Sequence, residues 1–399
     1  MNRRTRPATM TDQITIMIAA RNASATIERA VRSCAGETHV PILLVDDHCT
    51  DDTVDRARAA AGGALRVIAA PDPGGIPLAR QAGLDAVDTP FATWLDADDE
   101  WVPGRMPGML AALEAGADVA VDAFDLHDGV TGTWLRTLTA PAFLARDGGA
   151  VRLFERNWLP GDSPVGFNVS TFRQAGGYDP AVYGPESYDL LLRAIARGAR
   201  FHWRDRVGYR IYAYPGSVSR HIARQRAAVA AALRKHAYEA IRTLYLHAGY
   251  DARVAAWALV SVALFRGEPD AALRFLEDAS PANADPDAIL EPDGPWPFAE
   301  GWRRAFTRGV ALLLTGGRDD EALAALELAE RVAPTAEGAN NRGVALARLG
   351  RMDEARIAWT LAEERFPGYA DPRTNAASPE AFAITTHPLR RLNSRNDYR

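Results

Sequence analysis

Along the N-terminal part of this chain, continuous apolar runs alternate with segments whose apolar residues recur at helical spacing. No other feature of the sequence constrains its fold as strongly. Residues 14–19 form a continuous apolar run, and the apolar positions from Ile27 to Cys34 recur at helical spacing. The unit repeats, with further expected strands at 42–45, 65–69 and 91–95 and expected helices at 54–61 and 77–86. Strands that alternate with helices predict an α/β fold with a mostly parallel, Rossmann-like sheet and helices on both faces.

Beyond residue 222 the sequence pattern changes to that of long helices rich in alanine, leucine and arginine. This pattern predicts an all-α domain at 223–370. Helices are expected at about 222–248 and 252–279, followed by a linker at 280–297. Small residues and a proline then recur at the offsets of the roughly 34-residue tetratricopeptide repeat, over about 302–369. The positions in the clearer copy are Gly343, Leu346, Gly350, Ala355, Trp359, Ala362 and Pro367. We expect a flexible tail at 1–12 and a loosely ordered tail at 371–399.

Composition excludes several classes of protein. With 399 residues, 47% of them hydrophobic, the chain has material for two domain cores. A net charge of -5 predicts no nucleic-acid binding, and the basic residues of the N-terminal tail are expected to be solvated. Cys34 and Cys49 are the only cysteines, so neither a disulfide framework nor a zinc site is expected. No apolar stretch approaches the ~20 residues that span a bilayer, and we predict a cytoplasmic protein.

A run of carboxylates, residues 96–100 apart from Ala97, directly follows the expected strand at 91–95. In an open α/β sheet the carboxyl ends of the strands face the ligand crevice. Residues two apart in an extended segment face the same side, so Asp96 and Asp98 can both reach that crevice. Mg²⁺ and Mn²⁺ combine one or two carboxylates with water and substrate phosphates. The pattern predicts a divalent cation that neutralises a leaving diphosphate, although Asp-x-Asp alone is common on surface turns.

Residues 13 to about 220 resemble the family 2 glycosyltransferases of the GT-A fold, because several motifs stand in the family's order. Residues 16–23 look like its opening strand and nucleotide loop, and Leu43-Leu44-Val45-Asp46-Asp47-His48-Cys49-Thr50-Asp51 is similar to its V-D-D-G-S-T-D segment. Ala79-Arg80-Gln81-Ala82-Gly83 looks like its A-R-N-x-G helix, and Leu95-Asp96-Ala97-Asp98-Asp99 matches its metal motif. The resemblance implies a GT-A domain at 13–222 and a nucleotide-sugar donor.

The resemblance also implies site residues. Asp47 would accept a hydrogen bond from the donor's base, which the backbone of Ala19 would also contact. Arg80 would lie beside the same base, although an ion pair on the helix face explains it equally well. Arg21 stands where the family often has tyrosine, and its planar guanidinium can stack on a base. The implied nucleotide-binding residues are thus Ala19, Arg21, Asp47, Arg80 and Asp96, the last toward the ribose, and the implied ligand of Mn²⁺ or Mg²⁺ is Asp98.

The catalytic base is the weakest match. Inverting transfer needs a base that deprotonates the acceptor, and the family supplies it from a G-E-D-x-D-L-x-L-R helix. The matching segment here is 184–193, with Ser187 where the catalytic aspartate usually stands. Either Glu186 takes the role, or the acceptor needs little help, as a thiol would, or transfer activity has been lost. We favour Glu186, and we expect Asp189 and Arg193 to form a structural pair across one helical turn.

A second departure lies in residues 209–219, which resemble the family's closing Y-R-x-H-P-G-S-x-S. Tyr214 stands where histidine is usual, and a histidine there would help to bind the metal or the diphosphate. His221 is one candidate substitute, and a surface histidine is the alternative reading of it. The residues expected in the region of the sugar and acceptor pocket are Trp158, Asp162 and Asn168.

The leading functional hypothesis is a metal-dependent inverting glycosyltransferase that moves a hexose from a nucleotide-sugar, with uridine diphosphate as the expected carrier. Repeat domains form concave surfaces that hold extended peptides, so the acceptor is expected to be a protein or peptide, or else a saccharide. Such repeats also drive dimerisation, and a homodimer through the helical domain is a further expectation. The alternative is a catalytically degenerate domain in a repeat-based adaptor protein. A nicotinamide dehydrogenase is excluded by the lack of a glycine-rich first turn.

Overall fold

The computed structural model describes residues 13–38, 40–63, 65–159, 163–214, 222–281, 283–378 and 381–389. The chain forms two compact units, Met1–Leu153 with Asn157–Ala232 and Phe154–Arg156 with Leu233–Arg399. The predicted boundary at 222 falls at the start of a helix, α9 (Ile222–Arg234), most of which belongs to the first unit. The predicted flexible tail at 1–12 lies outside the described residues.

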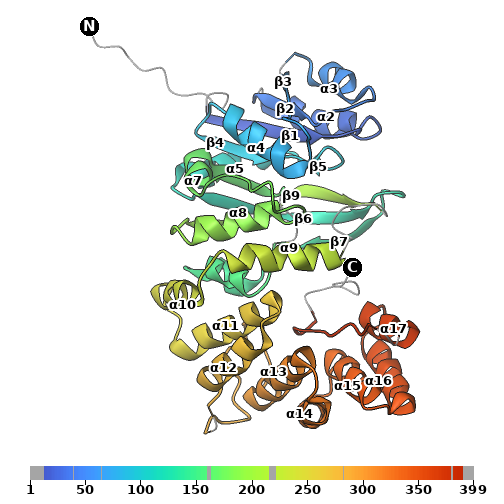
Figure 1. The fold of residues 1–399 in the computed structure, drawn as a ribbon. Helices are drawn as coiled ribbons and strands as arrows, with labels where there is room; N and C mark the ends of the chain where they lie inside the picture. Colours follow the sequence, from blue (N-terminus) through green and yellow to red (C-terminus); the bar gives the residue numbers. More distant parts are fainter. Residues whose placement is uncertain are drawn as a thin grey trace. The chain divides into compact units, whose positions relative to one another are not determined.

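The first unit is built on one mixed sheet, which has nine strands among the described residues (Figure 1). The strands are β1 (Ile14–Ala20), β2 (Ile42–Asp46), β3 (Leu65–Ala69), β4 (Phe91–Trp94), β5 (Glu100–Trp101), β6 (Val119–Asp128), β7 (Trp134–Leu138), β8 (Val165–Asn168) and β9 (Phe201–Ala213). Their order is β3-β2-β1-β4-β8-β6-β9-β5, with β7 paired to β6. The first four strands are parallel, as the alternation predicted, whereas β8 runs antiparallel to both β4 and β6.

Helices pack on the faces of this sheet and explain why β1 and β2 are largely apolar along their whole length. The helices of this unit are α2 (Ile27–Thr38), α3 (Thr53–Ala61), α4 (Ile76–Ala86), α5 (Arg105–Glu114), α6 (Ala142–Ala145), the 3₁₀ helix η1 (Gly149–Phe154), α7 (Val169–Gln174), α8 (Glu186–Ile195) and α9. Ile16 and Ile18 of β1 join one core with Ile27 of α2, while Val45 of β2 packs with Ala79 of α4 in another. A strand covered on both faces has no polar side, so its sequence does not alternate. The predicted α/β fold is confirmed.

Gly83 lets α4 approach the sheet closely, which gives a test of this packing. A Cβ at this position would lie 2.9 Å from Cη2 of Trp94 and 3.2 Å from Cγ2 of Val45. We expect Gly83→Ala to lower the free energy of unfolding by about 1–3 kcal/mol, because an added methyl group in a filled core forces its neighbours to move. Urea denaturation of the variant measures this change. Asp85→Ala, at an exposed position of the same helix, is the control, and equal effects of the two substitutions would contradict the prediction.

The second unit is helical among its described residues. Its helices are α10 (Tyr238–His247), α11 (Ala252–Arg266), α12 (Pro269–Ala279), α13 (Glu300–Thr315), α14 (Asp319–Val332), α15 (Ala336–Arg348), α16 (Met352–Arg365) and α17 (Ala370–Ala377). The two long helices expected at 222–248 and 252–279 are each broken in two. The second breaks because Gly267 takes a left-handed conformation that ends α11, and Pro269 then begins α12. No described helix combines the length and apolar character needed to cross a membrane.

The expectation of a loosely ordered segment at 371–399 is wrong for most of its described part. Residues 371–377 belong to α17, and residues 381–389 pack into the second unit, with Ile384 and Leu389 buried. Side-chain amides of α15 and α17 satisfy the N–H and carbonyl groups of Ala383 and Thr385, which are not paired in regular secondary structure. Residues 390–399 lie outside the described part of the chain.

Candidate active site

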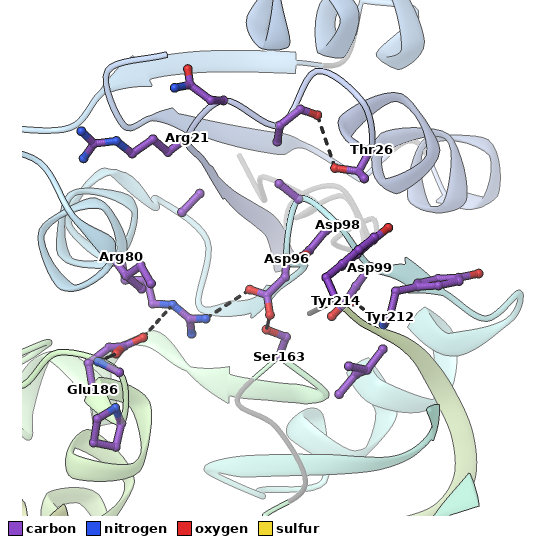
Figure 2. Close-up of a pocket in the computed structure, with 18 of the residues that line it drawn as sticks. Arg21, Thr26, Arg80, Asp96, Asp98, Asp99, Ser163, Glu186, Tyr212 and Tyr214 are labelled. Carbon is purple, nitrogen blue, oxygen red and sulfur yellow. Dashed lines mark hydrogen bonds and ion pairs between the residues drawn. The ribbon is translucent and has the colours of Figure 1, made fainter. Parts of the chain in front are cut away.

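A cleft of about 760 Å³ in the first unit collects most of the predicted site residues (Figure 2). Its walls come from the loop after β1, the turn after β4, the start of α8 and the end of β9. The cleft therefore opens at the carboxyl ends of the parallel strands, where open α/β sheets bind ligands. Predicted site residues that line it are Ala19, Arg21, Arg80, Asp96, Asp98 and Glu186, together with Tyr214.

Other predicted residues lie elsewhere. Asn168 does not line the cleft, and instead caps α7 by accepting hydrogen bonds from the backbone N–H groups of Ser170 and Thr171. Trp158 is buried with its ring edge-to-face against Phe143, while its chain neighbours Asn157 and Leu159 line the cleft. The pocket role expected of Asn168 is thus not what the structure gives it. Asp162 and His221 lie outside the described residues.

The acidic turn after β4 is held by backbone hydrogen bonds. The N–H of Leu95 donates to the carbonyl of Met17 in β1 at 2.9 Å, which extends the sheet pairing by one residue. The N–H of Asp96 then donates to the hydroxyl of Tyr209 at 2.9 Å, and the N–H of Asp99 donates back to the carbonyl of Asp96 at 3.1 Å. This turn brings three carboxylates together at the edge of the sheet.

Burial and neighbouring carboxylates disfavour the charged forms of Asp98 and Asp99. Burial and the neighbouring Asp96 raise the pKa of Asp98 to about 6. Burial, followed by the charges of Asp96 and Asp98, raises the pKa of Asp99 well above its ordinary value, although its Oδ1 accepts a hydrogen bond from the N–H of Tyr212. Among the described residues no side chain hydrogen-bonds to the Asp98 carboxylate. A cation beside Asp98 would relieve this repulsion.

Arg80 connects the acidic turn to the start of α8. Its guanidinium is 7% exposed and lies 3.2 Å from Oδ1 of Asp96 and 3.4 Å from Oε1 of Glu186, as the dashed lines in Figure 2 show. The same group donates to the hydroxyl of Ser187 at 2.8 Å. An arginine can hold these partners at once because its donors are spread over a rigid plane. The ion pair expected as the alternative for Arg80 is therefore present, and it is made with predicted site residues.

Glu186 lines the cleft although its side chain is only 2% exposed. Its Oε2 accepts a hydrogen bond from the N–H of Gly184 at 2.9 Å. Burial raises the pKa of Glu186, while the charge of Arg80 and the Gly184 hydrogen bond oppose the rise. A carboxylate with a raised pKa is a stronger base than an ordinary glutamate.

Arg21 lines the cleft, and Asp47 lies beside it. Asp47 is 4% exposed and does not line the cleft; its Oδ1 accepts a hydrogen bond from the N–H of Gly75 at 2.8 Å. Its Oδ2 lies 3.8 Å from a guanidinium nitrogen of Arg21, whose side chain is 57% exposed. Arg21 thus presents a planar, largely exposed cationic group at the cleft, with Asp47 as its counterion.

Three residues near the cleft were missed by the sequence analysis. Ser163 donates to Oδ2 of Asp96 at 2.6 Å, and Tyr209 is buried beneath the acidic turn. Arg29 of α2 donates to the backbone carbonyl of Asp98 and lies over the ring of Tyr212, 3.9 Å from its centroid. The Tyr-Arg start of the closing motif was the only sequence signal for Tyr209, and Ser163 and Arg29 had none.

The two predicted structural partners do pair. Arg193 donates to Oδ2 of Asp189 at 2.7 Å across one turn of α8, as predicted. Arg193 also donates to the carbonyls of Ala175 and Gly177, which fixes the end of α7. Neither residue lines the cleft.

The carboxylates of the cleft suit a metal cation that is coordinated partly by the phosphates of the substrate. Within the described ranges no group of three or more histidine, cysteine, aspartate or glutamate side chains is arranged to hold a metal ion. Asp98 is the one carboxylate of the turn that lines the cleft without a side-chain partner in the described structure. Mg²⁺ and Mn²⁺ commonly take one or two carboxylates and complete their shells with water and substrate phosphates. The site suits such a cation and does not suit one caged by protein alone.

Fold and site together define a class of protein. Open α/β proteins bind ligands at the carboxyl ends of their parallel strands, and this chain has there a cleft with an acidic turn and a buried arginine–carboxylate cluster.

Comparison with known proteins gives the family. The family model "Glycosyl transferase family 2" matches residues 15–173. The succinoglycan biosynthesis protein ExoO of Rhizobium meliloti is 30% identical over 265 residues, which cover 59% of this chain and 72% of that protein. The succinoglycan biosynthesis protein ExoU of the same bacterium is 30% identical over 214 residues, covering 49% and 60%. The chain therefore belongs to glycosyltransferase family 2, and it is a glycosyltransferase, as the motifs predicted.

A solved structure shares the fold. S. aureus TarS 1-349 in complex with UDP-GlcNAc superposes with a TM-score of 0.50 at 13% sequence identity, covering 89% of this chain and 93% of that chain. The likeness supports the GT-A fold that the sequence predicted.

Proposed function

We propose that this glycosyltransferase moves a hexose from a UDP-sugar to an acceptor with inversion at the anomeric carbon and with the help of Mn²⁺ or Mg²⁺. The observation that carries the proposal is the cleft itself, where the half-buried carboxylate of Asp98 lies beside Asp96 and across from Glu186, with no side chain of the described residues hydrogen-bonded to it. One end of the cleft thus offers oxygen ligands for a cation and the other offers a base. The structure of TarS with UDP-GlcNAc supports a uridine nucleotide as the carrier.

In this proposal Asp98 would hold the cation. The cation supplies positive charge that stabilises the leaving group. Asp96 accepts hydrogen bonds from the ribose, with Ser163 and Arg80 keeping its carboxylate in place. Arg21 stacks on the base, and the backbone of Ala19 at the end of β1 contacts it.

Transfer then needs a base that takes the proton of the attacking hydroxyl group. The acceptor's hydroxyl oxygen attacks the anomeric carbon, the bond from that carbon to the diphosphate oxygen breaks, and UDP leaves with the bonding electrons. Glu186 takes the hydroxyl proton. Its burial raises its pKa and makes it a better base, and Arg80 keeps it oriented. Ser187 hydrogen-bonds to Arg80 and has no basic group to offer.

The acceptor is proposed to be a protein or peptide, or a saccharide, with a hydroxyl that reaches Glu186. Asn157 and Gln225, which also line the cleft, can hydrogen-bond to either kind of acceptor. A homodimer through the helical unit remains a further proposal.

Ligand-dependent stability tests the donor side. We expect UDP with Mn²⁺ to raise the thermal midpoint by several degrees at a free concentration about 100-fold above Kd, because both bind only the folded cleft. UDP with a chelator should give a smaller shift, and Mn²⁺ alone little. Differential scanning fluorimetry with these three mixtures makes the measurement.

Absence of any shift across the common nucleotides would favour the alternative, a degenerate domain in an adaptor protein, which the serine at position 187 suggests. A shift with UDP and Mn²⁺ would then be followed by a screen of UDP-sugars for metal-dependent donor hydrolysis, which identifies the sugar.

A further inference from the structure

Three buried asparagines in the second unit hold a segment of the same chain. Asn340 and Asn341 lie next to each other on α15, and Asn375 lies on α17; all three are 0% exposed. They contact residues 381–389, the segment that follows α17 and is coloured red in Figure 1. Buried amides are costly unless they are hydrogen-bonded, so this contact must satisfy them.

Asparagine side chains recognise the backbone of this segment at alternate residues. Asn341 donates to the carbonyl of Thr385 at 2.8 Å and accepts from its N–H at 2.9 Å. Asn375 does the same for Ala383, donating to its carbonyl at 3.0 Å and accepting from its N–H at 2.6 Å. Asn340 also donates to the carbonyl of Ala383 at 3.2 Å. Ala383 and Thr385 are two residues apart. In an extended chain, residues two apart face the same side, so both can face the asparagines.

Side chains of the segment fill apolar positions between these contacts. His387 stacks on Phe265 with ring centroids 3.8 Å apart, and Ile384 joins the main core of the unit. Leu389 packs in a small cluster with Tyr369 and alanines of α15. Residues 381–389 contain no aspartate, glutamate, lysine or arginine, although these make up 24% of the chain.

We propose that this groove is a peptide-binding site, and that residues 381–389 occupy it as a ligand in cis. The ligand in trans is an extended, uncharged segment of a partner protein, with an apolar residue and an aromatic or histidine residue spaced as Ile384 and His387 are. Paired donor and acceptor contacts to peptide groups provide affinity for any extended chain, and the apolar positions select among sequences. A tethered ligand has a high effective concentration, so the cis segment keeps the groove closed to weak competitors.

A synthetic peptide with the sequence of residues 381–389 is the probe. Its binding is measured by fluorescence polarisation to the full-length chain and to its Thr385→Pro variant. Proline removes the N–H that donates a hydrogen bond to Asn341. The substitution therefore weakens binding of the cis segment and changes no residue of the groove. We expect the variant to bind the probe at least about ten-fold more tightly than the native chain. Adding Asn341→Ala to that variant should abolish the gain, and a probe with proline at the Thr385 position should not bind.

Equal affinity of the native chain and a folded Thr385→Pro variant would overturn the proposal, as would a gain that survives Asn341→Ala. Circular dichroism checks that the variant is folded. Should it not fold, hydrogen–deuterium exchange on the native chain decides. Excess free probe should then accelerate exchange at Ala383 and Thr385 of the cis segment, a scrambled peptide should not, and unchanged exchange would refute the site. A native dimer that the probe dissociates would place a second copy's segment in the groove and overturn occupancy in cis.

Discussion

Replacing Asp98 with asparagine is expected to lower kcat/KM for sugar transfer by about 10²–10³-fold without unfolding the protein. The substitution keeps the size of the side chain and removes the one carboxylate of the acidic turn that lines the cleft without a side-chain partner in the described structure. In our proposal that carboxylate holds the cation on the diphosphate, so the leaving group loses its main counter-charge. The effect should appear at every donor concentration, because it acts on the transition state.

Stability should change in the opposite direction. Burial and Asp96 raise the pKa of Asp98 to about 6, from an ordinary value of 3.8. The folded state therefore binds the proton more tightly than the unfolded state, and stability falls as the pH rises from about 4 to about 6. Asp98→Asn removes the disfavoured charge, so its thermal midpoint at pH 7 without metal should equal or exceed that of the native enzyme.

Steady-state transfer assays and thermal melts on the same preparations test both parts. Asp88→Asn, whose side chain is 92% exposed, is a control for loss of one negative charge, and it should change neither quantity appreciably. Transfer by Asp98→Asn at a rate near that of the native enzyme would remove Asp98 from the proposed cation site. Loss of activity with loss of folding would leave the stability argument wrong.

Glu186→Gln is expected to reduce transfer by about 10²–10⁴-fold, the range typical of losing a general base. Glutamine has the shape of glutamate but cannot accept the proton of the acceptor's hydroxyl. Donor affinity, measured by titration with UDP and Mn²⁺, should change only a few-fold, because Glu186 lies on the acceptor side of Arg80. The loss should therefore appear in kcat and not in the Kd of the donor.

The neighbouring residue provides a matched control. Ser187→Ala removes the hydroxyl that accepts a 2.8 Å hydrogen bond from Arg80 but leaves Glu186 in place, so it should cost only a few-fold in transfer. Introducing Ser187→Asp into the Glu186→Gln background supplies a carboxylate at the family's usual position and should restore part of the activity. A Glu186→Gln enzyme with native transfer rates would exclude this residue as the base and favour an acceptor that ionises readily.

The parallel half of the fold was predictable because its strands are short, largely apolar runs that alternate with helical spacing, whether they are buried, as β2 is, or only partly buried, as β3 is. The apolar run at 42–45 became β2 with one added residue, and 65–69 became β3 without change. The mixed half gave a weaker signal. Strand β9 carries three arginines and an aspartate among its thirteen residues, and none of the four is buried, so it has neither a continuous apolar run nor clean alternation. Strand β8 has only four residues, too few for a period to show.

Sequence motifs predicted many residues of the site, but they did not predict the contacts between those residues. The order of segments around Asp47, Arg80 and Asp98 predicted that they belong to one region. The contact between Arg80 and Ser187 joins positions 107 apart in the sequence, and a local pattern cannot report it. The groove in the second unit was missed for a similar reason: adjacent asparagines in a helix look like surface residues until the segment that buries them is placed.

Arg80 has one further consequence for the reaction. A single guanidinium serves as counterion for Asp96, on the proposed nucleotide side, and for Glu186, on the proposed acceptor side. Any ligand that draws Asp96 toward itself shifts the balance of charge at Glu186, and the proton affinity of the base then depends on what occupies the first subsite. The enzyme would in this way favour an order of addition, with sugar donor before acceptor. The proton affinity of its base would stay low while no activated sugar is bound.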